Sequence, residues 1–71
     1  MEYVINALFV HFDDTAEDVR SSIFSNLRMA AVVDPRLVGK QAHQHLNRMM
    51  HKDLCRELIE YCEERIQELN S

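Results

Sequence analysis

Three of the four histidines and one of the two cysteines lie close together in the sequence, between positions 43 and 55. His51 and Cys55 are four positions apart, a spacing that places two metal ligands on one face of a helix. His43 and His45 would point about 200° apart on an ideal helix, so they cannot both join such a site. The sequence contains no Cys-x-x-Cys or His-Glu-x-x-His motif. We therefore expect no metal site and no cofactor.

Cys55 and Cys62 could in principle act as nucleophiles beside a histidine. However, no sequence feature indicates a lowered thiol pKa, and no glycine-rich loop is present to stabilise an oxyanion or bind phosphate. Seven positions along one helix separate the two Cα atoms by about 10 Å, too far for a disulfide. We expect reduced core cysteines in a cytoplasmic protein, with the nucleus as the alternative compartment, and no enzymatic activity.

Charge is segregated along the chain. Residues 1–34 carry a net charge of −4, residues 35–52 carry +4 and residues 53–71 carry −4. The basic segment either neutralises its acidic neighbours or binds a partner, and we favour the first. Acidic flanks and the absence of aromatic residues from the segment argue against nucleic acid. The candidate partner-binding residues are Arg20, Arg28, Arg36, Lys40, Arg48 and Lys52.

A helical period runs through the whole chain, which has one Gly and one Pro in 71 residues. We expect an all-α fold with helices over residues 2–12, 16–33, 35–49 and 54–69. Asp34 and Pro35 are typical of a helix N-cap and first helical position, and Asp53 is expected to cap the last helix. Asp14 and Thr15 are candidates for a capping box at the second helix.

The length allows one domain, and the longest apolar run, residues 29–33, is too short to span a membrane. Short links predict antiparallel neighbouring helices. Periodicity leaves two architectures open, a four-helix bundle or two stacked helical hairpins. A shift of 35 positions aligns Asp18 and Ile23 with Asp53 and Leu58, as two diverged hairpins would.

The segment from Ile5 to Ala31 resembles a HEAT repeat. It has an apolar helix, an Asp at position 14 in the turn, and Val19-Arg20 early in the second helix. The resemblance implies two HEAT-like hairpins stacked as an α-α superhelix, with residues 1–34 forming one and residues 35–71 a divergent, capping one. It also implies that the turn Asp bonds exposed amides or an Arg, and that the Val anchors the hairpin core. The function implied is a non-catalytic scaffold for protein partners; the alternative is a free-standing bundle that binds nucleic acid through residues 35–52.

The first expected helix has no capping residue and is apolar on most sides, so we expect a preceding repeat to cover it and the chain to be the C-terminal part of a longer solenoid. Within the HEAT family, the Asp-Asp turn, the Asp34-Pro35 pair, the His-rich third helix and the Cys-containing last helix are similar to those of factors that assemble axonemal dyneins. That similarity implies a role in the assembly of cilia.

Overall fold

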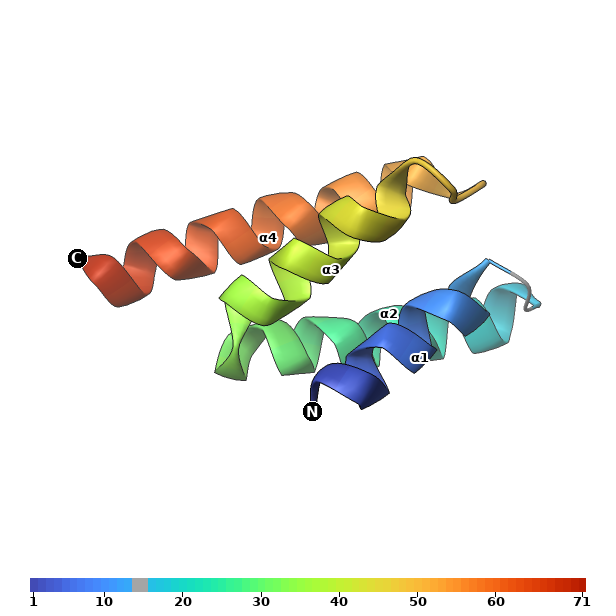
Figure 1. Ribbon diagram of the computed structural model, residues 1–71, viewed down its shortest axis with the longest axis horizontal. Helices are drawn as coiled ribbons and strands as arrows, with labels where there is room; N and C mark the ends of the chain where they lie inside the picture. Colours follow the sequence, from blue (N-terminus) through green and yellow to red (C-terminus); the bar gives the residue numbers. More distant parts are fainter. Residues whose placement is uncertain (14–15) are drawn as a thin grey trace.

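The computed structural model describes residues 1–13 and 16–71, and over these residues the protein is all-helical. Helix α1 comprises Glu2–Phe12, α2 Glu17–Val33, α3 Pro35–Leu46 and α4 Lys52–Asn70 (Figure 1). No strand is present in the described part of the chain. The expectation of an all-α fold with four helices is therefore confirmed.

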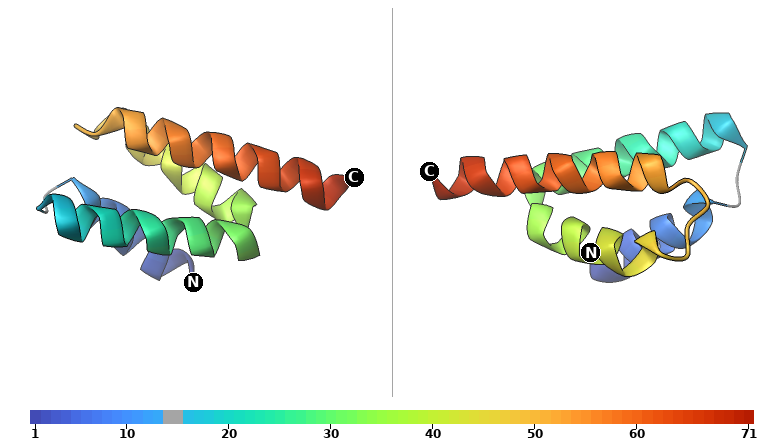
Figure 2. Two further views of the ribbon diagram at one scale, coloured as in Figure 1. Left: turned by 180° about the vertical axis from the view of Figure 1, so that it is seen from behind. Right: turned by 90° about the horizontal axis from the view of Figure 1, so that it is seen from above.

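The four helices form two antiparallel hairpins that lie side by side. α1 pairs with α2 and α3 pairs with α4, the second pair being the more extensively packed (Figure 1). The hairpins meet through α1 against α3 and through α2 against both α3 and α4, whereas α1 and α4 do not touch over the described residues. α1 and α3 thus form one layer, and α2 and α4 form the other (Figure 2).

A single hydrophobic core runs between the two layers. Each helix contributes residues to it, at the three- and four-residue spacing of one helix face. Both cysteines belong to this core, as the sequence predicts. The buried apolar side chains are Ile5, Phe9, Phe12, Leu27, Ala31, Val38, Ala42, Met49, Cys55, Leu58, Ile59 and Cys62.

Asp34 is the single residue that links the two hairpins. Its backbone N–H donates to the carbonyl of Ala30 at 2.8 Å and so closes α2. Its carboxylate accepts the N–H of Leu37 at 3.3 Å and so caps α3, with Pro35 at the first helical position. The predicted cap is confirmed, and one residue ends one helix and starts the next.

The link between α3 and α4 differs from the sequence prediction. α3 ends at Leu46 rather than at residue 49, and α4 begins at Lys52, so Asp53 lies inside the helix and the prediction of an Asp53 cap is wrong. Asp53 instead forms an exposed ion pair with Arg56 at 3.8 Å. Met49 lies outside a helix but is buried, with 3% of its surface exposed. Because a buried apolar residue at this spacing fits the helical pattern, the sequence predicted a helix that continues to residue 49.

The N-cap residue of α2 is Ala16, and over the described residues no side chain caps this helix start. The predicted capping box at Asp14 and Thr15 falls outside the described residues. No helix in residues 1–13 or 16–71 combines the length and the apolar character that crossing a bilayer requires.

Candidate functional site

The basic segment does not form one continuous surface. Arg36 and Lys40 lie on α3, whereas Arg48 and Lys52 lie beyond its far end, which is roughly 18 Å away for a helix of twelve residues. The guanidinium of Arg36 donates to Asn70 Oδ1 at 3.1 Å, and Lys52 Nζ donates to the carbonyl of Met49 at 2.7 Å. Two of the four cations thus bond to the protein itself.

The two predicted arginines of α2 have different surroundings. Arg20 is half-buried near the start of α2. Arg28 is exposed on the side of α2 that faces α4, where its guanidinium carbon lies 4.9 Å from the centre of the Tyr61 ring. This is a cation–π contact between the two helices. Of the predicted basic residues, Arg28 is the one that the fold places in a hollow shared by α2 and α4.

The three histidines between positions 43 and 51 differ in burial and in their contacts. His45 is buried, its ring stacks on Phe9 at 5.2 Å between centroids, and its Nε2 lies 2.9 Å from Asn6 Oδ1. Burial, with a smaller contribution from Arg48, lowers the pKa of His45 below its usual 6.5. His43 is exposed, and His51 is the N-cap residue of α4.

Burial raises the pKa of both the Cys55 and Cys62 thiols to about 11, so both are protonated at neutral pH. The Cys55 thiol donates to the carbonyl of Ala42 at 3.4 Å. Among the described residues, no three His, Cys, Asp or Glu side chains are grouped in a way that could hold a metal ion. This geometry offers neither an activated nucleophile nor a ligand set.

Asp13, at the end of α1, contacts the turn between α3 and α4. Its two carboxylate oxygens accept the N–H groups of Met50 and His51 at 2.8 and 3.2 Å. A turn Asp that bonds exposed amides is the role that the HEAT resemblance implies for the adjacent Asp14. Asp14 lies outside the described residues, so its expected role stays a prediction; the contact that Asp13 makes spans 37 positions, which no local pattern could connect.

Two hydrogen bonds hold α1 against α3. The side-chain amide of Gln41 donates to the Glu2 carbonyl at 3.0 Å, and His45 bonds to Asn6. The two residues of each pair are 39 positions apart in the sequence. Glu2 and Asn6 are four residues apart on α1, and Gln41 and His45 are four residues apart on α3. The two helices therefore run parallel and in register, with one bond per turn.

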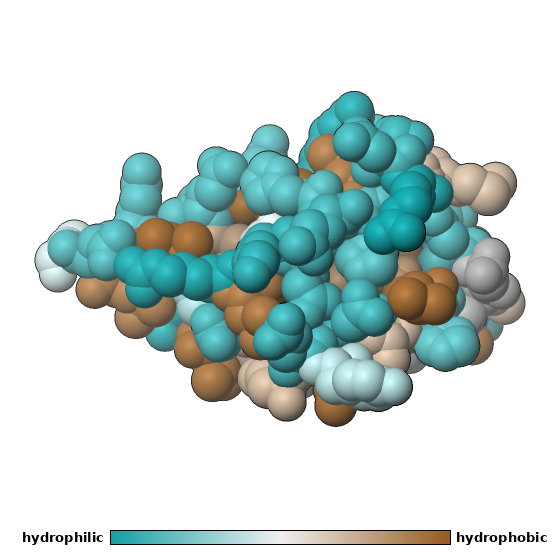
Figure 3. Space-filling view, in the orientation of Figure 1, coloured by the Kyte–Doolittle hydropathy of each residue, from teal (hydrophilic) through white to brown (hydrophobic). Residues whose placement is uncertain are grey.

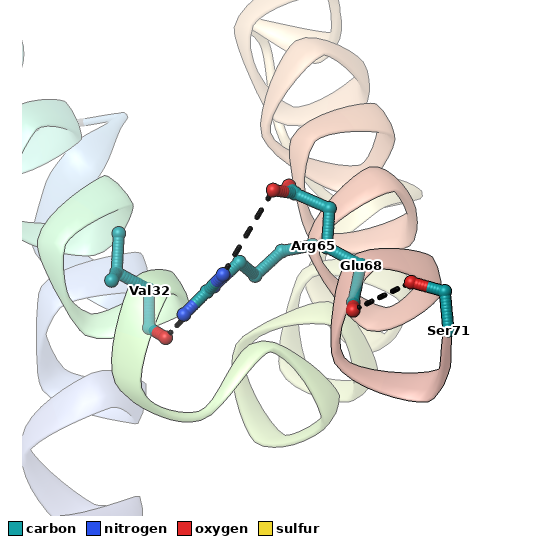
Figure 4. A network of polar contacts seen from close by, with 4 residues as sticks. All are labelled: Val32, Arg65, Glu68 and Ser71. Atoms are coloured by element: carbon teal, nitrogen blue, oxygen red, sulfur yellow. Dashed lines mark hydrogen bonds and ion pairs between the residues drawn. The ribbon is translucent and has the colours of Figure 1, made fainter.

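Arg65 ties α4 to the end of α2. Its Nε donates to the carbonyl of Val32 at 3.2 Å, and its guanidinium lies 4.0 Å from Glu68 (Figure 4). Glu68 in turn accepts a hydrogen bond at its backbone carbonyl from Ser71. Val32 is in the last turn of α2, where carbonyls have no partner within the helix, so Arg65 supplies one. No local sequence pattern distinguishes Arg65 from the other charged residues of α4.

Two adjoining hollows are lined by residues of α2 and α4, the two helices that face the viewer when the molecule is seen from behind (Figure 2, left). One hollow, of about 360 Å³, is lined by Ser25, Arg28, Met29, Val32 and Tyr61. The adjoining hollow, of about 180 Å³, is lined by Phe24, Arg28, Glu57, Glu60, Tyr61 and Glu64. Because Arg28 and Tyr61 line both hollows, we treat them as one α2–α4 groove with an apolar and an acidic end.

Exposed valines lie on the side of the first hairpin that faces away from the second. Val4, Val19 and Val33 are 58%, 48% and 74% exposed. At 100° per residue, Val4 lies about 160° from Asn6, which contacts α3. Val19 and Val33 lie about 180° and 140° from Arg28, which contacts α4. We call Val4, Val19 and Val33 the free face.

The exposure of Val19 corrects an expectation, because the HEAT resemblance implies a core residue at this position. In this chain no described helix covers it. In the space-filling view, hydrophobic atoms gather along the lower margin, over α1 and the end of α2, whereas the surface over α3 and α4 is mostly hydrophilic (Figure 3).

Comparison with known proteins returns no match to a protein family, to a curated protein or to a solved structure.

Proposed function

We propose that this chain is a non-catalytic protein-binding module, formed by two HEAT-like hairpins that stack on a further hairpin through the free face. The observation that carries the proposal is the free face itself. Val4, Val19 and Val33 are exposed on the one side of the first hairpin that no described helix covers. Val19 and Val33 lie on the same side of α2 but fourteen residues apart, roughly 21 Å, with the exposed polar residues Ser22 and Asn26 between them, so the free face offers separate apolar contact points rather than one continuous patch.

The contacts between the hairpins support a repeat arrangement. Within each layer the two hairpins pack side by side, α1 on α3 and α2 on α4, and the turn residue Asp13 reaches the next turn along the stack. Such contacts are made between nearest neighbours only, so they extend to a third hairpin without rearranging the first two. In a longer solenoid, Val19 would then be covered by the preceding hairpin.

The absence of an activated nucleophile among the described residues favours binding over catalysis. Both thiols are protonated, and the one histidine with a shifted pKa is packed against Phe9 inside the hairpin interface. The similarity to dynein assembly factors favours the assembly of axonemal dyneins in the cytoplasm as the process that this module serves.

The alternative, nucleic-acid binding through residues 35–52, receives less support. Arg36 and Lys52 already bond to Asn70 and Met49, and the six acidic residues between positions 53 and 71 lie close by on α4. A phosphate backbone could not contact all four separated cations at once, and the nearby carboxylates would repel it.

Site-specific photo-cross-linking tests the proposal. A photoreactive residue replaces Val33 on the free face, and a matched one replaces Met50, an apolar residue that is 83% exposed in a turn away from that face. In cells that express the protein, we expect defined protein adducts from position 33 and none from position 50. Equal labelling at both positions would contradict the proposal. So would binding of labelled DNA or RNA at low salt that Lys40→Glu abolishes, because that result favours the alternative.

A further inference from the structure

The α2–α4 groove is a second surface, separate from the free face. Its apolar end holds Met29 and Val32, which are 69% and 42% exposed, with the ring of Tyr61 beside them. This hollow is shallow and wide open, so it suits one side chain of a segment lying across the surface rather than an enclosed small ligand. Because Met is flexible and polarizable, this end can adapt to differently shaped apolar groups.

The other end of the groove is strongly acidic. Glu57, Glu60 and Glu64 line it, and no Lys, Arg or His in the described part of the chain forms an ion pair with any of them. Arg28 is the one cation that lines this hollow, and it lies over the Tyr61 ring. Three carboxylates against one guanidinium leave a negative potential at the mouth of the hollow.

We propose that the α2–α4 groove binds a basic peptide segment that carries one apolar anchor residue. The anchor occupies the apolar end against Met29, Val32 and Tyr61, and the Lys or Arg residues beside it pair with Glu57, Glu60 and Glu64. This inference rests on the proposed function, since it names the chemistry of one partner of the module.

Charge complementarity selects this occupant over others. The three carboxylates repel phosphate groups, which argues against nucleic acid and anionic lipid surfaces at the same site. They also repel acidic peptides. An uncharged apolar segment would leave the carboxylates without partners, whereas a basic segment with one apolar residue matches both ends of the groove.

Fluorescence anisotropy with a defined probe tests the inference. The probe is a fluorescein-labelled peptide, Lys-Arg-Lys-Leu-Lys-Arg-Lys, with one control peptide in which Ser replaces Leu and another in which Glu replaces every basic residue. We expect the probe to bind the full 71-residue chain, more weakly as salt rises, and the acidic peptide not to bind. The Ser peptide should bind more weakly than the probe.

Two neighbouring glutamates provide a matched pair of variants. Glu64 lines the groove, whereas Glu63 is exposed on the same helix and does not line it. Glu64→Gln should weaken binding of the probe by about two- to fivefold, as the loss of an exposed ion pair does, and Glu63→Gln should leave it unchanged. Met29→Gln should weaken binding of the Leu peptide and not of the Ser peptide.

Equal effects of Glu63→Gln and Glu64→Gln would overturn the inference, because they would show general electrostatic attraction without a site. Failure of the probe to bind would overturn it too, as would self-association of the chain through the groove in place of peptide binding. If any of these results overturned the groove inference, protein adducts at position 33 would still support the proposed protein-binding function of the free face. Probe binding without adducts at Val33 would instead contradict the proposed free-face interface alone.

Discussion

At the scale of single residues, the chain is held together by a few polar side chains that reach across the two hairpins. Asp13 bonds the turn before α4, His45 and Gln41 bond α1, and Arg65 bonds the end of α2. In each contact the two bonded residues are 33 to 39 positions apart in the sequence. Short polar side chains near a turn also cap helices locally, so the sequence could suggest their chemistry but not their distant partners.

Removing the Asp13 carboxylate should destabilise the fold. Asp13→Ala leaves the N–H groups of Met50 and His51 without their acceptor, and we expect a loss of about 1–2 kcal/mol in the free energy of unfolding. Asp53→Ala is the control, because it removes an exposed ion pair and a favourable charge in the first turn of α4 and should cost less than about 1 kcal/mol. Urea unfolding measures both. Equal effects would contradict the cross-hairpin role of Asp13.

His45 should make stability depend on pH. Because its pKa is lowered in the folded state, the unfolded chain binds a proton first as the pH falls. The contribution of His45 is therefore fully present well above pH 6.5, is lost as the pH falls through 6.5, and levels off below the lowered folded-state pKa. Urea unfolding from about pH 8 to pH 5 should show this loss. His45→Gln should flatten the profile and His43→Gln should not; the opposite pattern would refute the assignment.

At the scale of the elements, the close packing of α3 on α4 depends on a small residue. A Cβ built at Gly39 would lie 3.4 Å from the Cβ of Cys62, which is an ordinary contact distance with no room beyond it. α3 can therefore approach α4 closely at this turn, which fits the extensive packing of this hairpin.

Two substitutions at Gly39 should have opposite effects. Gly39→Ala should stabilise the protein by about 0.5–1 kcal/mol, because alanine favours the helix and its methyl group fits. Gly39→Val should destabilise it by about 1–3 kcal/mol through overpacking against Cys62. Thermal unfolding measures both shifts. Destabilisation of similar size by Ala and Val would show that the hairpin tolerates no Cβ at all.

The helix boundaries differ in how well they could be predicted from the sequence. Asp34 and Pro35 carry local capping chemistry, so that junction could be predicted to the residue. The junction before α4 could not, because Met49 is buried without being helical and Asp53 resembles a cap without acting as one. The groove between α2 and α4 was also beyond prediction, since Arg28 and Tyr61 meet only when the hairpins pack.

At the scale of the whole molecule, the two hairpins leave apolar side chains exposed on the far side of the first hairpin as well as in the α2–α4 groove. The core fills the space between the layers, but Val4, Val19 and Val33 lie on the far side of the first hairpin. The sequence indicated this surplus, because its first helix is apolar on most sides. Which residues stay exposed depends on the packing of α1 on both α2 and α3.

The central claim is that the free face is an interface, and sedimentation equilibrium tests it most directly. Three proteins are compared: the parent chain, Val33→Lys on the free face, and Met50→Lys, which adds the same charge at an exposed apolar residue elsewhere. In isolation, we expect the parent and Met50→Lys to self-associate with rising concentration and Val33→Lys to stay monomeric with unchanged helix content. A parent chain that is monomeric to its solubility limit, or two variants that behave alike, would contradict the claim.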